Sequence, residues 1–174
     1  MQKRRFVVTG GSGFVGQFLI KKLSSLYPDS EIHNIDIQHP IGLGFSNVSN
    51  HIIDLTDQQS LKSFKFSEND IVYHLAAYIF TDHVPSKAKR EGWFESLNVY
   101  GTQNLLAAME ENGAKNIAFI STDMVYGSPQ TNPIETNHPL NPNGPYGLSK
   151  IKAEKLIGDF GARKDFRSII FRPR

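Results

Sequence analysis

The chain has 174 residues, enough for one domain that buries a sizeable hydrophobic core. Its formal net charge of +2 is too small to indicate nucleic-acid binding, and the absence of cysteine excludes disulfides and thiolate metal sites. No apolar run approaches the roughly 20 residues of a membrane span. We therefore expect a soluble, cytoplasmic protein that binds neither nucleic acid nor membranes.

A strand, a glycine-rich turn and a helix open the chain and predict a nucleotide site. Residues 6–8 are apolar and mostly β-branched, and Gly10, Gly13 and Gly16 follow. Gly10 permits a tight turn, Gly13 lets a ligand approach the backbone, and Gly16 lets the helix pack against its own strand. Such a turn can also be purely structural, but the flanking strand and helix favour pyrophosphate binding. The expected buried helix face holds Val15, Phe18, Leu19, Leu23 and Leu26.

The second predicted strand, residues 31–36, ends in an acidic residue. Asp36 lies twenty residues after Gly16, and a carboxylate there can accept hydrogen bonds from both adenosine ribose hydroxyls. Its charge also repels a 2′-phosphate. A simple turn aspartate is the alternative, but the spacing favours a ribose contact and NAD over NADP.

Strand and helix patterns continue to alternate along the chain. Six strands with intervening connections predict an α/β fold, a doubly wound parallel sheet of order 3-2-1-4-5-6. Beyond residue 36 we expect strands at 51–53, 70–77, 116–121 and 168–172, and helices at 57–64, 92–112 and 145–160. In the long central helix the expected buried residues are Trp93, Leu97, Tyr100, Leu105 and Met109.

Three local features refine this outline. His74 has no second ligand at metal spacing, so we expect a buried, hydrogen-bonded structural histidine and no metal site. Gly101 within the predicted helix costs about 1 kcal/mol relative to alanine, which indicates a close packing contact. Residues 127–145 contain five prolines and no helical period, which is typical of a functional loop.

Tyr146 and Lys150 lie four residues apart at the start of a predicted helix, one turn from each other. An ammonium beside a phenol lowers the tyrosine pKa, so the pair can exchange a proton with a secondary alcohol while hydride passes to or from NAD. Lys150 can also bond the nicotinamide ribose. The spacing alone occurs often by chance, and its place after a dinucleotide turn and a hydroxyl-bearing strand end favours catalysis.

Taken together, the motifs resemble those of the extended short-chain dehydrogenase/reductases, specifically the NAD-dependent sugar-nucleotide epimerase/dehydratase family, across the whole chain. The motifs that carry the resemblance are 9–16, 74–77, 98–102, 121–127 and 145–150, with Glu135 and Glu154 also as expected. The resemblance implies a catalytic set of Thr122, Tyr146 and Lys150. It implies a cofactor site of Gly10, Gly13, Phe14, Val15, Asp36, Asp54, Leu55, Leu75, Ala76, Ala77, Asn98, Tyr146 and Lys150.

Two departures from the family pattern bear on the reaction. Family 4,6-dehydratases carry an Asp-Glu pair after the catalytic hydroxyl, whereas this chain has Asp123 followed by Met124. A thioether cannot take a proton, so epimerisation through a transient keto-sugar, or plain oxidation and reduction, is favoured. Family 4-epimerases commonly place a lysine near the position of Ile79, so another residue contacts the pyrophosphate or cofactor affinity is lower.

The resemblance also implies a second, C-terminal domain that holds the nucleotide-sugar substrate. Residues 1–174 would then be the NAD-binding domain alone, without the substrate domain and by itself inactive. The family further implies a homodimer through the helices at 92–112 and 145–160. The alternatives are a reductase of another secondary alcohol, such as a hydroxysteroid, and a non-catalytic NAD-sensing module. The intact catalytic set disfavours the sensor, and the sequence leaves the sugar and the reaction direction open.

Overall fold

The computed structural model describes residues 4–40, 42, 44–81, 83–163 and 165–174. Six parallel strands form one sheet in the order β3-β2-β1-β4-β5-β6, which confirms the predicted doubly wound fold. The strands are β1 (Arg5–Thr9), β2 (Glu31–Asp36), β3 (Val48–Ile52), β4 (Asp70–His74), β5 (Asn116–Ile120) and β6 (Arg167–Phe171).

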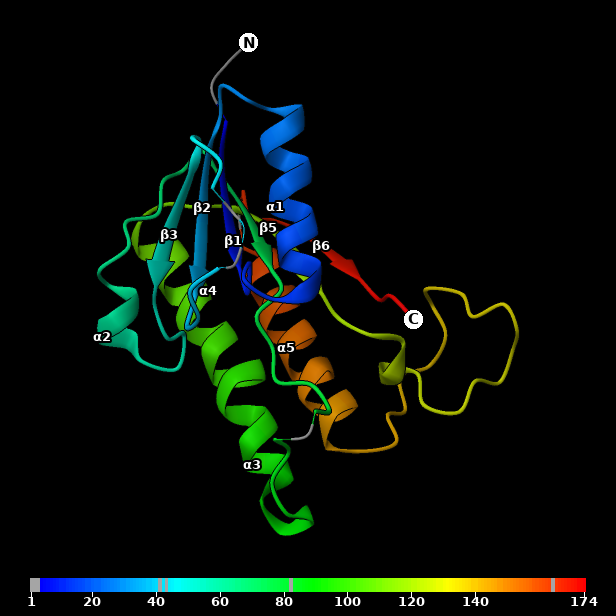
Figure 1. Cartoon of the computed structure of the whole chain (residues 1–174). Coiled ribbons are helices and arrows are strands. Elements are labelled where there is room, and N and C mark those ends of the chain that lie inside the picture. Colours follow the sequence, from blue (N-terminus) through cyan, green and yellow to red (C-terminus); the bar gives the residue numbers. More distant parts are fainter. Residues whose placement is uncertain (1–3, 41, 43, 82, 164) are drawn as a thin grey trace.

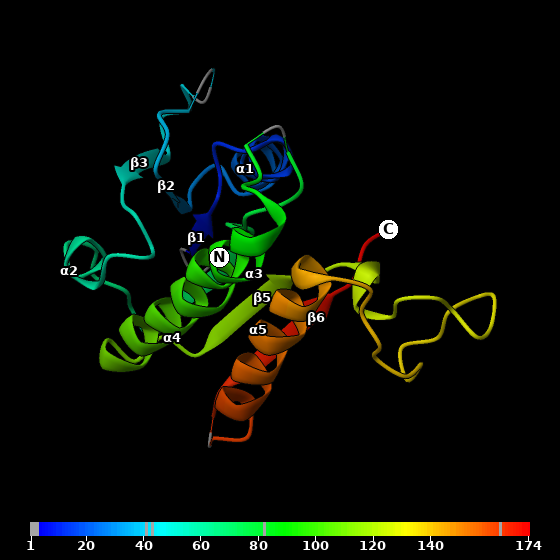
Figure 2. The same cartoon turned by 90° about the horizontal axis from the view of Figure 1, so that it is seen from below.

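Helices cover the two faces of this sheet unequally. Figure 2 shows α1 on one side of the sheet and α3, α4 and α5 on the other, while the segment after residue 126 projects outward as an extended loop (Figures 1 and 2). The helices are α1 (Phe14–Leu26), α2 (Gln58–Leu61), α3 (Arg90–Glu95), α4 (Thr102–Glu111) and α5 (Pro145–Gly161). Short 3₁₀ turns occupy Lys87–Lys89 and Asp123–Val125.

Each face of the sheet has its own apolar core, because side chains alternate along every strand. On the α1 side the core consists of Phe6, Val8, Ile20, Leu23 and Ile32. On the other side a larger core gathers strand residues with those of α2, α4 and α5, including Val7, Ile35, Val72, Leu105, Met109, Phe119 and Ile157.

The buried face of α1 differs from the predicted one. Val15, Phe18 and Leu26 are 59%, 62% and 56% exposed, whereas the buried residues of this helix are Gly16, Ile20, Leu23 and Ser24. The prediction was right for Leu23 and wrong for Val15, Phe18 and Leu26, because the small residues Gly16 and Ser24 let the helix approach the sheet. The contact stripe is therefore rotated away from the most apolar one. An apolar pattern does not register glycine or serine as contact positions.

The predicted helix 92–112 is interrupted in its middle by a π-helical segment, Ser96–Gly101. The wider turn changes which side chains face inward, so Tyr100 is 56% exposed while Phe94, which was not expected in the core, is fully buried. Leu105 and Met109 are buried as predicted. A Cβ added to Gly101 would lie 2.9 Å from Leu97 Cδ1, which confirms the close packing expected there.

His74 is a buried structural histidine, as predicted. Its Nδ1 lies 2.7 Å from Thr9 Oγ1 and its Nε2 lies 2.8 Å from Thr102 Oγ1, so both ring nitrogens are engaged. Burial lowers the pKa of His74 to about 3, and the Lys150 charge adds to this effect. The ring is therefore neutral at physiological pH.

Among the described residues, no helix is both long and apolar enough to cross a membrane.

A second histidine, His33 in the middle of β2, is held neutral by its neighbours on β1 and β3. Arg5 Nε donates to His33 Nε2 at 3.1 Å, and His33 Nδ1 lies 3.0 Å from His51 Nε2. Because Nε2 must accept from a permanent cation, a protonated ring does not fit this arrangement. Burial, followed by the Arg5 charge, lowers the pKa of His33 to about 4.

This depressed pKa predicts a pH-dependent stability. In the unfolded chain His33 takes up a proton near pH 6.5, whereas in the folded chain it does so only near pH 4. Its contribution is therefore complete above pH 6.5 and is lost as the pH falls to 4, by at most about 3 kcal/mol. Urea unfolding at pH 7.5 and 4.5 should show a smaller loss for His33→Gln than for the unmutated chain. The exposed His39→Gln serves as the control and should retain the full loss.

Candidate cofactor and catalytic site

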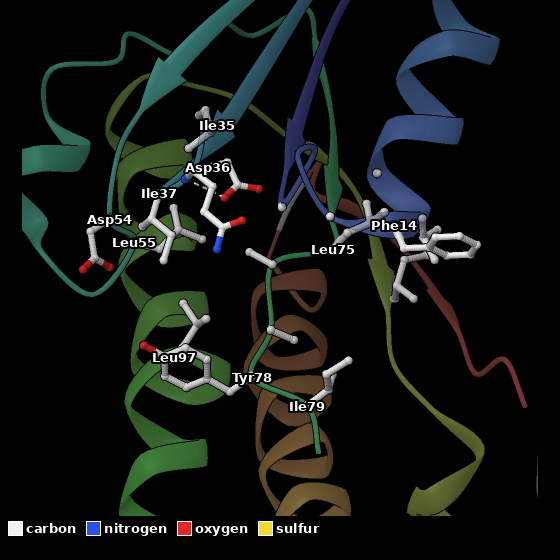
Figure 3. Close-up of a pocket in the computed structure, with 18 of the residues that line it drawn as sticks. Phe14, Ile35, Asp36, Ile37, Asp54, Leu55, Leu75, Tyr78, Ile79 and Leu97 are labelled. Carbon is white, nitrogen blue, oxygen red and sulfur yellow. Dashed lines mark hydrogen bonds between the residues drawn. The ribbon is translucent and has the colours of Figure 1, made fainter. Parts of the chain in front are cut away.

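A cavity of about 430 Å³ opens where the carboxyl ends of β1, β2, β4 and β5 meet (Figure 3). Ligands of open α/β sheets bind at this edge, because the strand order reverses there. The cavity brings together the predicted cofactor residues Gly10, Gly13, Phe14, Val15, Asp36, Asp54, Leu55, Leu75, Ala76, Ala77, Tyr146 and Lys150. Of the predicted set, only Asn98 is not part of its lining.

The glycine turn forms a cradle in which side chains have no room. Gly10 has a φ of +71°, and a Cβ there would lie 2.6 Å from the backbone nitrogen of Ala76. A Cβ on Gly16 would lie 2.3 Å from the Gly10 carbonyl oxygen. Gly13 caps α1 without a side-chain hydrogen bond, so the first amides of the helix lie beside the cavity. This arrangement fits a pyrophosphate.

Asp36 is fixed before any ligand arrives. Its Oδ2 accepts from the Ser12 amide and its Oδ1 from the Gln38 amide, both at 3.0 Å. The carboxylate thus joins the glycine turn to the end of β2, and in Figure 3 it lies across the cavity from Phe14. Asp54 receives both bonds from Thr56 on Oδ1 alone, each 2.8 Å long. Both carboxylates line the cavity and keep further acceptor capacity beyond these bonds.

Asn98 lies behind the cavity wall. It is 1% exposed, its Oδ1 accepts from the Tyr78 amide at 2.7 Å, and its Nδ2 donates to the Tyr78 carbonyl at 3.0 Å and to Ser149 Oγ at 2.9 Å. The π-helical segment brings this side chain against the chain that follows β4. Asn98 therefore clamps a wall-forming backbone to α5, and its amide is fully engaged in doing so.

Lys150 is buried at the inner end of the cavity, 2% exposed, with Nζ 4.1 Å from the centre of the Phe119 ring. Burial lowers its pKa to about 7, and the nearby Glu154 carboxylate opposes that shift. The ammonium is therefore close to its titration point at neutral pH. An aromatic face and one carboxylate stabilise the charged form.

Tyr146 differs from expectation in the direction of its pKa. Burial raises the pKa of Tyr146, a hydrogen bond from Thr122 lowers it, and the Asp123 charge raises it further. The predicted lowering of this pKa by Lys150 was wrong for the protein alone: the ammonium packs over Phe119, whereas the phenol lies among Phe80 and Phe94.

Thr122 completes the predicted catalytic set. It is 8% exposed, its Oγ1 accepts from the Met124 amide at 3.2 Å, and its side chain hydrogen-bonds with that of Tyr146. The structure thus brings Thr122, Tyr146 and Lys150 together. Ser121, the residue before Thr122, lines the cofactor cavity, while Asp123 and Met124 line a second, open cavity of about 1050 Å³.

Several wall residues were not predicted. They are apolar or aromatic and directly follow strands or lie on the long helix, namely Ile37, Ile53, Tyr78 and Leu97. Tyr78 stacks on Trp93 with ring centres 4.3 Å apart and planes at 5°. Its place directly after Ala76-Ala77 was the only signal, and nothing in the sequence alone separates such residues from ordinary core.

The fold and this site define a dinucleotide-dependent enzyme class, and comparison with known proteins specifies the family. Residues 6–174 match the model of the NAD dependent epimerase/dehydratase family, to which the chain belongs. The family confirms NAD as the predicted cofactor.

Individual relatives include both reaction types of the family. The chain is 39% identical over 154 residues to N-acetyl-alpha-D-glucosaminyl-diphospho-ditrans,octacis-undecaprenol 4-epimerase of Escherichia coli O157:H7, covering 88% of this chain and 43% of the relative. It is 34% identical over 178 residues to dTDP-D-glucose 4,6-dehydratase of Mus musculus, covering 97% and 49%. The chain thus spans about half the length of the relatives it matches.

A solved structure shares the same architecture. It is a short-chain dehydrogenase/reductase superfamily protein from Agrobacterium tumefaciens with bound NAD, at 27% identity and a TM-score of 0.82, covering 97% of this chain and 48% of that one.

Asp36 provides a direct test of cofactor choice. We expect NAD to bind much more tightly than NADP, and Asp36→Asn to weaken NAD binding by about 10-fold or more, because hydrogen bonds to a charged acceptor are lost. The variant should also narrow the difference between the cofactors, since the charge that repels a 2′-phosphate is gone. Calorimetric titration of the 174-residue chain with both cofactors measures this. Asp29→Asn, on an exposed turn, is the matched control; equal affinities in the unmutated chain would contradict the assignment.

Proposed function

We propose that the chain is the NAD-binding domain of a sugar-nucleotide epimerase that oxidises and re-reduces a secondary alcohol of its substrate. The observation that carries this proposal is the convergence of Thr122, Tyr146 and Lys150 beside the cofactor cavity. A relative that is named UDP-glucose 4-epimerase supports the sugar-nucleotide substrate class. A sensor of NAD has no use for a hydroxyl that hydrogen-bonds to a phenol, with an ammonium lining the same cavity as that phenol.

The chain's own residues account for binding and proton transfer. The glycine turn would hold the pyrophosphate, Asp36 the adenosine ribose, and Lys150 the nicotinamide ribose. When bound, NAD supplies a hydride acceptor and a positive charge. Tyr146, as phenolate, takes the proton of the sugar hydroxyl while the Thr122 hydroxyl orients that oxygen, and Tyr146 returns the proton when the keto group is reduced.

Met124 favours epimerisation over elimination. Its thioether stands where family dehydratases have a glutamate, and its side chain is 41% exposed on the second cavity, next to Asp123. No proton acceptor therefore follows Asp123 at that wall. The sequence similarity to dehydratases extends over the shared fold. The residue at position 124, in contrast, concerns elimination, the step that separates dehydratases from epimerases.

The sheet itself supports the proposal that a further domain completes the enzyme. Ile169 and Phe171 of β6 are 52% and 46% exposed, while Ile170 between them packs into the large core. An edge strand that presents large apolar side chains on one face is suited to being covered by another part of the protein. We further propose that α5 and the helical stretch from α3 to α4 form the homodimer surface, where Leu148 of α5 and Tyr100 of the intervening π-helical segment are exposed. Sedimentation velocity tests the dimer.

Tyr146→Phe tests the mechanism. In an enzyme that carries both halves, this variant should lose turnover by at least about 100-fold, because it removes the acid–base group. Its NAD affinity should stay within a few-fold of the unmutated value. Lys150→Ala should reduce both. Turnover is followed by chromatography of the sugar nucleotides, and near-normal rates for Tyr146→Phe would contradict the proton path.

The 174-residue chain should bind NAD without turning over substrate. Its melting temperature should rise with the logarithm of NAD concentration. Catalysis needs the sugar held in reactive geometry, and a misplacement of about 1 Å can cost on the order of 100-fold in rate. Overnight incubation with NAD and a panel of UDP-, GDP- and dTDP-sugars should therefore yield no epimer. Robust turnover would overturn the two-domain proposal.

A further inference from the structure

A buried ion pair lies behind the catalytic set. Glu154, on α5, is 6% exposed, and Arg172 follows β6. Arg172 donates to both carboxylate oxygens, from Nε to Oε1 at 3.0 Å and from Nη2 to Oε2 at 2.7 Å. This bidentate geometry is the strongest form of an ion pair between side chains.

The pair joins segments that carry the reacting groups. Ser121 Oγ donates to Glu154 Oε1 at 2.5 Å, and Ser121 directly precedes Thr122. Arg172 Nη1 donates to the Tyr126 hydroxyl at 2.9 Å and to the Thr136 carbonyl at 3.2 Å. The segment that contains Thr122 is thus fixed by hydrogen bonds to Glu154 and Arg172. Glu154 lies on α5, the helix that also carries Tyr146 and Lys150.

The backbone reinforces this bracket around Thr122. The Ser121 amide donates to the Phe171 carbonyl at 2.7 Å and the Asp123 amide donates to the Pro173 carbonyl at 2.9 Å. The chain after β5 therefore pairs with the chain after β6 on both sides of Thr122. Arg172 lies between these two bonds and turns its side chain toward α5.

Glu154 also belongs to the charge environment of Lys150, which lies one helical turn earlier. Lys150 also lies near the neutral His74 from β4, over the ring of Phe119 from β5, and lines the same cavity as Tyr146 of α5. Within this environment Glu154 is the group that favours the charged form of Lys150. The bidentate contact with Arg172 offsets part of that carboxylate charge.

We propose that Glu154, held by Arg172, is a positioning residue that fixes the Thr122 segment against α5 and balances the buried Lys150 ammonium. The catalytic purpose of this positioning rests on the proposed function. The contacts and charges themselves do not depend on that proposal. Glu154 does not touch the cofactor cavity, so it acts through Ser121 and Lys150.

Two substitutions should move the titration of Lys150 in opposite directions. Glu154→Gln removes the negative charge but keeps an acceptor for Ser121 and Arg172, so the pKa of Lys150 should fall by about one unit. Arg172→Gln removes the positive charge beside Glu154, so the pKa of Lys150 should rise. The measurement is a pH titration of the 174-residue chain by NMR, following the side-chain carbon next to the lysine nitrogen, with the Lys150 signal assigned by Lys150→Met.

Further variants separate positioning from general damage. Asp70→Asn breaks another buried ion pair, that of Arg5 with Asp70, at the far end of the sheet. It should lower the melting temperature without moving the Lys150 titration. Arg172→Lys keeps the charge and should leave the Lys150 pKa near its unmutated value, which preserves the test should Arg172→Gln not fold.

Shifts of the same sign for Glu154→Gln and Arg172→Gln, no shift for Glu154→Gln, or an equal shift for Asp70→Asn would overturn the proposal. Because no substrate is used, its failure is distinct from failure of the epimerase mechanism. The epimerase mechanism would be contradicted by near-normal turnover of the Tyr146→Phe variant. That result is independent of the Lys150 titrations.

Discussion

The close approach of the Gly10 backbone to Ala76 is the constraint on which the site depends. No side chain fits between the turn after β1 and the end of β4, since a Cβ on Gly10 would lie 2.6 Å from the Ala76 nitrogen. This contact closes the floor of the cavity and directs the start of α1 toward it. Asp36 then fixes the turn from the other side through the Ser12 amide. The cradle is therefore already formed without a cofactor, and such preorganisation lowers the entropic cost of binding.

Much of the fold could be predicted from the alternation of strand and helix patterns in the sequence and from the turn residues between them. β2 begins and ends where its pattern predicts, and the sheet order follows from six strands joined by right-handed crossovers. The expected cofactor-site residues could also be predicted from the sequence, because the glycine turn and Asp36 are local motifs whose spacing fixes their geometry. A parallel sheet brings the carboxyl ends of its strands to one edge, so residues far apart in the sequence meet there.

The errors share a physical origin: they concern contacts that depend on helix rotation or on electrostatic context. The π-helical turn at Ser96–Gly101 exposes Tyr100 and turns Asn98 toward the Tyr78 backbone, and no residue pattern announces a single wide turn. On α1, contacts by Gly16 and Ser24 shifted the buried stripe. The raised pKa of Tyr146 likewise reflects burial among aromatic rings, which a spacing of four residues to Lys150 does not reveal.

Lys150 and Tyr146 together explain why such a site would stay inactive without its cofactor. In the protein alone, burial opposes charge on both: it raises the pKa of the phenol and lowers that of the ammonium to about 7. The phenolate needed to accept a proton is therefore disfavoured. A positive charge entering the cavity would stabilise the phenolate. A ribose hydroxyl would give the Lys150 ammonium, which packs over the Phe119 ring, a hydrogen-bond acceptor. Cofactor binding would thus create the reactive protonation state, in addition to supplying the hydride acceptor.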